Sequence, residues 1–192
     1  MGTSTTGRRS AARERLLETA RQVFYARGIN GISVDEVIAS ADVSRATFYR
    51  HFPGKDDLVR AYLQEEDRSI RERVDGAAKA AANPSEVLHL LVLGLDEQIC
   101  GAGFRGCPFI NAAAEYPDPA HPVREVVAEH RTWFINAVTE LVTAIGHPNP
   151  ERAARAVVML RDGAMVGGYL DDPKATGDSL AHAVDAVTRN PS

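Results

Sequence analysis

Apolar side chains recur every three or four positions through most of this sequence, which is the spacing of one buried face of an α-helix. Between residues 10 and 27 this face comprises Leu16, Ala20, Val23 and Phe24. Gly28 then supplies a helix stop. The same spacing, punctuated by proline and glycine, predicts further helices over residues 55–82, 84–99, 108–116, 122–145, 151–170 and 174–189. No β-type alternation is sustained, so we expect an all-α protein of about nine helices.

Two short helices with a tight turn between them are predicted over residues 33–52. Ser33 and Glu36 form the pattern of a capping box, so the first of these helices begins at Val34. Ser44 is a second N-cap candidate and begins the next helix. Ala46, Phe48 and Phe52 can turn inward, which leaves on the outside Arg45, Thr47, Tyr49, Arg50 and His51. This is helix-turn-helix geometry, in which the second helix enters the major groove of DNA.

A plain helical hairpin with solvated polar residues is the alternative interpretation of this stretch, and the distribution of charge favours DNA. Residues 1–55 hold nine Lys and Arg and five Asp and Glu side chains, a net charge of +4. Because the whole chain carries −4, the remainder carries −8. A basic end on an acidic body is typical of a protein whose one end meets a polyanion.

An ordered set of motifs runs through roughly residues 10–70. It consists of Arg13-Glu-Arg-Leu-Leu-Glu-Thr-Ala20, Phe24, Gly28, Ser33-Val34, Ala41-Asp-Val-Ser44 and Thr47-Phe-Tyr-Arg-His-Phe52, followed by Lys55 and Leu58. This set resembles the DNA-binding domain of the tetracycline-repressor (TetR) family of bacterial regulators. The family usually has Gly in the inter-helix turn, where this chain has Asp42. Asp tolerates positive φ better than most residues, so we expect the turn to be preserved.

The resemblance implies a role for each position near the second helix of the pair. The predicted DNA-binding residues are Ser33, Val34, Ser44, Arg45, Ala46, Thr47, Tyr49, Arg50, His51 and Lys55. Residues 33 and 34 would lie near the DNA backbone, residues 45–47 would face base edges, and Tyr49, His51 and Lys55 would hold phosphates. Arg45 suits a bidentate contact with guanine, and the Thr47 methyl suits thymine. Packing against the first helix is a second interpretation of Tyr49.

These assignments divide the chain into three parts. Residues 1–9 are expected to form a flexible basic tail, in which Arg8 and Arg9 either stay solvated or reach DNA as an arm. Residues 10–55 form a three-helix, helix-turn-helix DNA-binding domain, and the family resemblance extends to about residue 70. Residues 56–192 form a larger helical regulatory and dimerisation domain.

The resemblance places dimerisation in the last two helices of this body and a ligand pocket in its middle helices. A face of mostly small or aliphatic side chains predicts a homodimer interface of Ala153, Ala156, Val157, Leu160, Ala164, Gly167, Leu180, Ala183, Val184 and Val187. Bulky and polar side chains predict a pocket of Gln98, Phe104, Phe109, Asn111, Tyr116, His130, Trp133, Phe134, Arg161, Asp162, Met165 and Tyr169. In both sets, ordinary packing within the chain is the alternative interpretation.

Catalytic and metal-binding patterns are missing from the sequence. There is no H-E-x-x-H, G-x-S-x-G, phosphate loop or G-x-G-x-x-G, so we expect neither an enzyme nor a metal or cofactor. Cys107 stands near a predicted helix N-terminus, which permits redox sensing with Cys100, although a small buried residue is the favoured interpretation. With no apolar run of about eighteen residues and no signal segment, we expect a cytoplasmic protein.

Together these observations predict a homodimeric, sequence-specific DNA-binding transcriptional regulator. The favoured hypothesis is a repressor that a small-molecule effector releases from a palindromic operator in double-stranded DNA. An activator and a DNA-binding protein without an effector are the alternatives.

Overall fold

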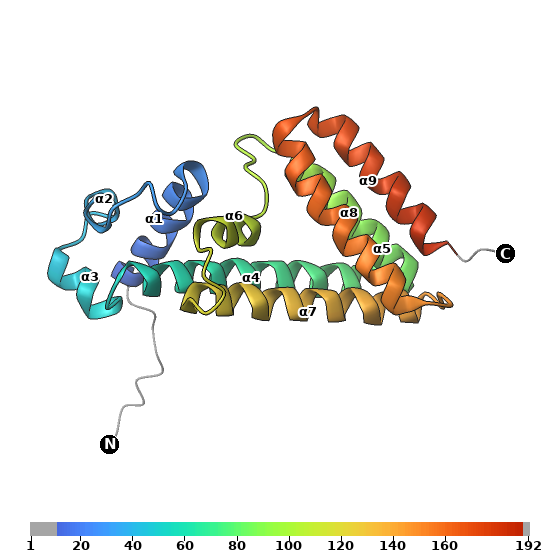
Figure 1. The fold of residues 1–192 in the computed structure, drawn as a ribbon, viewed down its shortest axis with the longest axis horizontal. Helices are drawn as coiled ribbons and strands as arrows, with labels where there is room; N and C mark the ends of the chain where they lie inside the picture. Colours follow the sequence, from blue (N-terminus) through green and yellow to red (C-terminus); the bar gives the residue numbers. More distant parts are fainter. Residues whose placement is uncertain (1–10, 190–192) are drawn as a thin grey trace, which may run out of the picture.

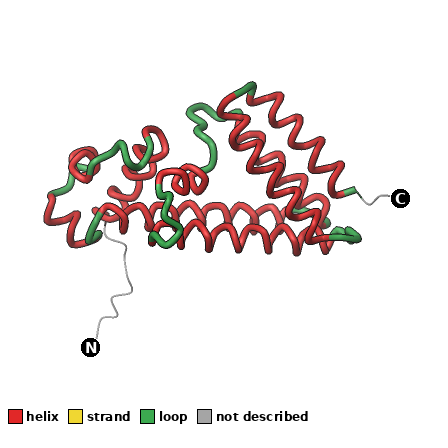
Figure 2. Tube along the Cα trace, viewed as in Figure 1, coloured by secondary structure: helices red, strands yellow, loops and turns green. Residues whose placement is uncertain are grey.

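The computed structural model describes residues 11–189, and all regular secondary structure in this range is helical (Figures 1 and 2). The elements are α1 (Ala11–Arg27), α2 (Val34–Ser40), α3 (Arg45–His51), α4 (Lys55–Ala80), α5 (Pro84–Ile99), α6 (Pro108–Glu115), α7 (Pro122–Ala144), α8 (Pro150–Leu170) and α9 (Pro173–Thr188). The prediction of an all-α fold is confirmed, and helix ends differ from the expected ones by one or two residues. The predicted tail over residues 1–9 lies outside the described range.

Two long helices, α4 and α7, lie side by side along the molecule (Figure 1). Helices α1, α2 and α3 gather at the beginning of α4, while α5, α8 and α9 stack over the far ends of α4 and α7. α6 lies between these two groups and packs on both α4 and α7. The first group and the body are therefore joined twice, covalently through α4 and by contact through α6. Within residues 11–189, no helix has both the length and the apolar character needed to cross a membrane.

Local signals in the sequence place α2 and α3 as expected. In the capping box, Ser33 Oγ accepts a hydrogen bond from Glu36 N at 3.2 Å, and Glu36 Oε2 accepts one from Ser33 N at 2.8 Å. Ser44 Oγ caps α3 by accepting from Thr47 N at 3.1 Å. Asp42 has φ 50°, as its position in the glycine-preferring turn predicted.

The core of this end forms where the apolar faces of α1, α2 and α3 meet the first turns of α4. Phe48 of α3 is fully buried there, beside Phe52. The prediction that Ala46 turns inward is wrong, because Ala46 is exposed. With about 3.6 residues per turn, position 46 lies on the opposite side of α3 from position 48. This helix is short and buries only one residue along its length, Phe48.

Proline begins each of the five helices from α5 to α9. The first turn of a helix has N–H groups without partners inside the helix, so the missing N–H of proline costs nothing there and its fixed φ favours the helical start. Asn83 and Asp172 also cap α5 and α9 with their side chains. These starts explain why the boundaries of the body could be read from sequence.

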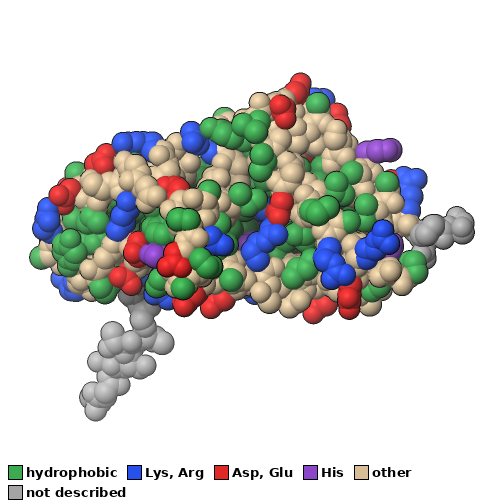
Figure 3. Space-filling model, viewed as in Figure 1, with side chains coloured by type: hydrophobic (Ala, Val, Ile, Leu, Met, Phe, Trp, Pro, Cys, Tyr) green, Lys and Arg blue, Asp and Glu red, His purple; other side chains and the backbone are tan. Residues whose placement is uncertain are grey.

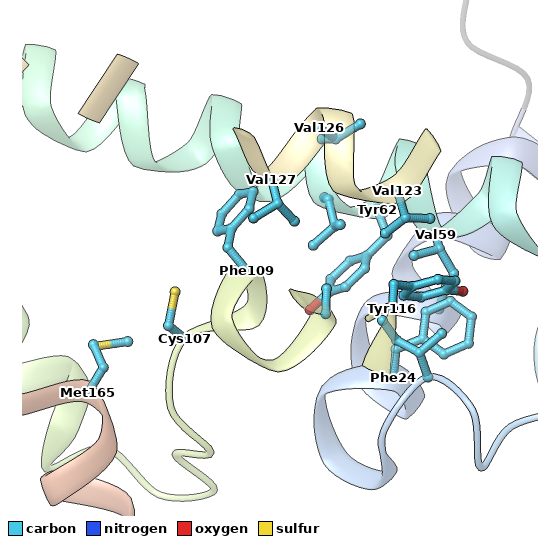
Figure 4. Close-up of a cluster of buried hydrophobic side chains, with 14 of the residues drawn as sticks. Phe24, Val59, Tyr62, Cys107, Phe109, Tyr116, Val123, Val126, Val127 and Met165 are labelled. Atoms are coloured by element: carbon cyan, nitrogen blue, oxygen red, sulfur yellow. The ribbon is translucent and has the colours of Figure 1, made fainter. Parts of the chain in front are cut away.

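α6 is fixed by aromatic side chains at both of its ends. Figure 4 shows Phe109 lying against Val127 of α7, and Tyr116 lying beside Phe24 of α1 and Val59 of α4. Phe109 is 1% exposed and Tyr116 is 9% exposed. Burial of side chains of this size contributes roughly 1.5–3 kcal/mol each. α6 is therefore a packed element that touches both the DNA-binding end and the body.

Candidate DNA-binding surface and cavity

The outer side of α3 presents polar groups on a rigid base. Phe48 points into the core, and Arg45, Ala46, Tyr49 and Arg50 are exposed on the other side. Figure 3 shows basic, acidic and apolar side chains together at this end of the molecule. Such a surface offers charge for phosphates and donors and methyl groups for base edges.

Arg45 forms an ion pair with Asp35 of α2, with 2.5 Å between Nη2 and Oδ1. Both side chains are about two-thirds exposed, at 64% and 65%. A solvent-exposed pair of this kind contributes at most about 1 kcal/mol. Little free energy is therefore lost if Arg45 leaves this carboxylate for another partner.

The hydroxyl groups at the beginning of α3 are linked to each other. The Oγ of Ser44 and the Oγ1 of Thr47 are 2.9 Å apart, in addition to the capping bond. Thr47 is half-buried, and its contact with Ser44 orients its hydroxyl group. Ser33 is likewise held by its capping box at the beginning of α2, where the adjacent Val34 is half-buried.

The remaining predicted phosphate contacts lie around the end of α3. Tyr49 is 47% exposed and its ring meets Phe48 edge-on at 5.2 Å, so it both packs within α3 and reaches solvent. His51 is half-buried, and Lys55 is the first residue of α4. The structure thus brings the ten predicted DNA-binding residues to one end of the molecule. Their contacts with DNA stay predictions.

A cavity of about 280 Å³ lies in the body among α4, α5, α7, α8 and α9. Four of the twelve predicted pocket residues line it: Gln98, Phe134, Arg161 and Met165. Most of the wall is aliphatic, and Glu66, Arg73, Gln98 and Arg161 add polar groups. An apolar space with a few polar anchors is the usual form of a small-molecule site.

The other eight predicted pocket residues lie outside the cavity wall. Phe109 stacks on His130 at 3.7 Å between ring centroids, and these two rings lie behind Phe134. The ring of Trp133 instead lies under the guanidinium of Arg71. The remaining contacts of these residues are Tyr169 with Arg105, Asn111 with the Arg105 carbonyl, Tyr116 with Asp56, and Asp162 with Arg131, while Phe104 is half-buried on the core. These side chains were predicted from bulk and polarity, whereas in the fold they pack on or bond to groups outside the cavity wall.

The contribution of α4 to the cavity was not predicted from the sequence. Glu66, Ile70, Arg73, Val74 and Ala77 all line it. Their spacing is that of one helix face, so the signal was present. The sequence predicts the helix over residues 55–82, but nothing local shows which partner covers one face of a long amphipathic helix.

Burial shifts the pKa values of two titratable groups, one in the cavity wall and one behind it. Desolvation raises the pKa of Glu66, and the nearby Arg21 and Arg73 oppose the shift. Desolvation lowers the pKa of His130, although its Nδ1 lies 2.7 Å from Asp67 Oδ1, which opposes the shift. The buried imidazole therefore favours the neutral form.

Hydrogen bonds join α6 and the preceding loop to the DNA-binding end. The Glu115 carboxylate accepts bonds from Ile29 N at 2.8 Å and from Asn30 N at 2.6 Å, in the loop between α1 and α2. Tyr25 of α1 accepts a bond from Arg105 N and donates one to Gly106 O, each at 2.9 Å. These contacts connect residues 80 to 86 positions apart in the sequence.

Tyr116 adds a further tie at the beginning of α4. Its hydroxyl donates to Asp56 Oδ1 at 3.0 Å, and burial together with this carboxylate raises the pKa of the phenol. At its other end, α6 begins with Pro108, which lines the cavity. One short helix thus touches the cavity at its first residue and the DNA-binding end at its last.

Comparison with known proteins agrees with both ends of this arrangement. Residues 16–62 match the family model described as "Bacterial regulatory proteins, tetR family", and residues 113–190 match "Tetracyclin repressor-like, C-terminal domain". The crystal structure of a TetR-family transcriptional regulator from Streptomyces coelicolor is 47% identical in sequence. Its TM-score is 0.90, and the similarity covers 93% of this chain and 94% of that one. The chain belongs to the TetR family.

Curated relatives of this TetR protein are also regulators. HTH-type transcriptional regulator LmrA of Bacillus subtilis is 27% identical over 125 residues, which cover 64% of this chain and 66% of LmrA. HTH-type transcriptional repressor DhaR of a Mycobacterium species is 32% identical over 76 residues, which cover 40% of this chain and 38% of DhaR. The family and the helix-turn-helix together make this chain a DNA-binding transcriptional regulator.

The predicted dimer residues of this TetR chain divide between two faces of α8 and α9. Five are buried within the protomer: Ala153, Val157, Ala164, Leu180 and Val184. Three of these, Val157, Leu180 and Val184, line the cavity. The other five, Ala156, Leu160, Gly167, Ala183 and Val187, are half-buried. The prediction centred on small side chains, and these let α8 and α9 approach each other and α5. The exposed apolar side chains of α8 are Met159, Val166, Tyr169 and Leu170.

The two cysteines lie in different surroundings. Cys107 is 2% exposed and lies at the beginning of α6, where its Sγ accepts a hydrogen bond of 3.3 Å from Arg161 Nη1. Cys100 is exposed at the end of α5. Within residues 11–189, no group of three or more His, Cys, Asp or Glu side chains is placed to hold a metal ion.

Proposed function

We propose that this TetR regulator is a homodimeric repressor that a small molecule in the α4–α9 cavity releases from a palindromic operator. The observation that carries the proposal is the position of α6. Its first residue, Pro108, lines the cavity, and Glu115 at its end binds two backbone N–H groups between α1 and α2. The name of the relative DhaR, a transcriptional repressor, supports the sign of regulation.

Release would follow from a shift of α6. A ligand that fills the cavity contacts Pro108 and displaces the beginning of α6, while Glu115 and Tyr116 carry the displacement to the α1–α2 loop and to the start of α4. The two recognition helices of a dimer must lie about 34–36 Å apart to enter successive major grooves. A ligand that favours another spacing shifts the population away from the DNA-bound form.

The exposed face of α8 is the proposed dimer contact. Met159, Val166 and Leu170 lie on this face, and Met159 is 73% exposed. A shallow groove lined by Met159, Gly163, Ala175 and Ser179 continues it between α8 and α9. Exposed apolar patches of this kind mark protein interfaces, and a two-fold pair is the commonest arrangement.

Substitution of Met159 by Glu tests the interface. Because Met159 is exposed in the protomer, Met159→Glu leaves the fold intact and should convert dimer to monomer in analytical ultracentrifugation. DNA affinity should fall with it. Glu140→Gln on α7, also exposed, is the control and should stay dimeric. A Met159→Glu protein that sediments as a dimer would contradict this interface.

DNA binding is tested with the full chain and the DNA upstream of its own gene. Fluorescence anisotropy at several salt concentrations should show a site that binds at least a thousandfold more tightly than scrambled DNA, with affinity falling steeply as salt rises. In a reporter strain, deletion of the regulator should raise transcription from that site. Lower transcription on deletion would exclude the repressor and favour an activator.

A further inference from the structure

Three of the four polar groups of the cavity wall, Glu66, Gln98 and Arg161, gather at its α6 end, and the fourth, Arg73, lies about 10 Å further along α4. α4 runs away from the DNA-binding end, whereas α5 and α8 run back towards it (Figure 1). Glu66, Gln98 and Arg161 therefore lie nearer to α6 than do Ala77, Leu88 and Val157. The wall from Glu66 to Ala77 rises by about 16 Å along α4. The cavity thus has one end where polar groups concentrate and a longer, mostly apolar part in which Arg73 is the charged residue.

Arg161 is the most buried charge of this polar end, with 8% of its surface exposed. Within residues 11–189, it hydrogen-bonds only through Nη1, to Cys107 Sγ at 3.3 Å and to Asp162 Oδ1 at 3.0 Å. Neither partner lines the cavity, although Arg161 does. The Nε and Nη2 atoms, which form the side edge of the guanidinium, are left for a group inside the cavity. A carboxylate fits this edge with two parallel hydrogen bonds.

The charges around Arg161 leave a positive excess. Asp162 is shared, because its other oxygen, Oδ2, lies 2.5 Å from Arg131 Nη1. Glu66, the acid that lines the wall, faces both Arg21 and Arg73, and burial raises its pKa. One carboxylate from a ligand would balance the remaining charge of Arg161. A ligand cation would instead have to compete with arginines for Glu66.

From this geometry we infer that the effector is a small amphipathic carboxylate, whose carboxyl group binds the Nε–Nη2 edge of Arg161 and whose apolar chain extends along α4 towards Ala77. The inference rests on the proposed function of the cavity as an effector site, and it names the chemistry of that effector. The Phe134 ring, 5.4 Å from the Arg161 guanidinium, covers the charged end. The volume of about 280 Å³ favours a single chain or ring of modest size.

Three probes with the same eight-carbon chain test the head group: octanoate, octanol and octylammonium. Binding to the full chain without DNA is measured by isothermal titration calorimetry. Octanoate should bind one molecule per protomer, at least tenfold more tightly than octanol, and octylammonium should bind most weakly. Equal affinity for octanoate and octanol, tighter binding of octylammonium, or no binding of octanoate would each overturn the inference.

Variants then locate the head group. Arg161→Gln should lose at least tenfold in octanoate affinity and keep its octanol affinity, and Arg161→Lys, which keeps the charge but loses the side edge, should fall between. Cys107→Ala removes one of the two hydrogen-bond partners of Arg161 and should retain the preference for octanoate over octanol. Lys79→Gln, a charge loss on α4 outside the wall, is the matched control. An Arg161→Gln protein that folds and binds octanoate normally would overturn the inference, and the wild-type probe series decides if that variant does not fold.

DNA release is measured separately, with octanoate added to the complex with operator DNA. Octanoate that binds in the Arg161-dependent way but leaves DNA bound would contradict the proposed release and not the carboxylate site. DNA release by octanoate that is unchanged in Arg161→Gln would contradict the carboxylate site and not the proposed release.

Discussion

On the α2–α3 surface, polar side chains bond to partners nearby in the sequence, whereas around the cavity several bond to partners far away. The Ser33–Glu36 and Ser44–Thr47 bonds span three positions, and the Arg45–Asp35 pair spans ten. In the body, Arg161 and Cys107 are 54 positions apart, and His130 and Asp67 are 63 apart. The DNA-binding surface is thus assembled by local capping, and the cavity only by the packing of distant helices.

The two regions also differ in the free energy that is lost when one of their charged side chains has no partner. Arg45 is exposed and can leave Asp35 for DNA, so its pair contributes little to stability. Arg161 is buried, so every N–H group of its guanidinium needs a partner or a place in the cavity. An exposed charge can change partners at little cost in free energy. A buried charge favours a neighbouring group of opposite charge, because leaving it unpaired is costly.

Substitution of Phe48 by Ala should have the largest effect on the free energy of unfolding, because it leaves a cavity in the core beneath the α2–α3 surface. Phe48 is fully buried, and such a truncation costs roughly 3–5 kcal/mol. Tyr49→Ala, its exposed neighbour, should lower DNA affinity and change stability little. Chemical denaturation and DNA anisotropy on both variants measure the contrast. Similar stability losses in the two would break the division of α3 into a core face and a DNA face.

Arg45→Ala should weaken DNA binding by about 1–3 kcal/mol and relax specificity at one base pair, without a measurable change in melting temperature. Asp35→Asn is the matched variant: it frees Arg45 and removes a negative charge beside DNA, so affinity should not fall. Competition anisotropy against single-base operator variants measures both. A lower melting temperature of Arg45→Ala would show that the surface pair stabilises the fold.

Glu115→Gln acts on the contact between the two regions. The carboxylate accepts two backbone N–H groups, and bonds of this charged kind contribute about 1.5–3 kcal/mol each at most. The amide keeps an acceptor but loses the charge, so the effect should be smaller than this range. Hydrogen exchange at Ile29 and Asn30 should become faster, while DNA affinity without effector stays near wild type. Unchanged exchange at these two amides would exclude α6 as their anchor.

The smallest effect is expected for Glu66→Gln, which should change the melting temperature by an amount that depends on pH. Burial raises the pKa of Glu66 above its ordinary value of 4.5, so the folded protein holds this proton more tightly than the unfolded chain does. The stability that the protonated carboxyl contributes is present below pH 4.5 and is lost as pH rises through the folded pKa. Glu66→Gln cannot ionise, so it should melt above wild type near pH 7, and the two should converge below about pH 4.5. A difference in melting temperature between Glu66→Gln and wild type that does not change with pH would contradict the raised pKa of Glu66.

Helix boundaries and the DNA-binding end could be read from the sequence because their causes lie within a few residues. The capping box at Ser33 fixed the start of α2, Asp42 took the positive φ that the turn requires, and proline marked the first turn of five later helices. Ala46 was the exception in this region. It is small enough for either face, so its side chain carried no signal for the inside or the outside.

In the body, the spacing of apolar residues predicted the apolar faces of the helices but not the elements that cover them. The stripe on α4 from Ile70 to Ala77 was visible, yet its role as cavity wall depends on α5 and α8. Half of the predicted dimer residues instead became the inner face of α8 and α9, since small side chains suit close packing within a protomer as well as between protomers.

The sequence by itself determined the helices, the turn and the outward polar groups of α3, because hydrogen bonds and φ angles among neighbouring residues decide these. Only the tertiary structure decided which side chains line the cavity, which nitrogen of Arg161 bonds Cys107, and that Glu115 reaches the loop after α1. These depend on burial and on contacts between segments more than fifty positions apart, and the free energy of a charge or a large side chain is set by that environment.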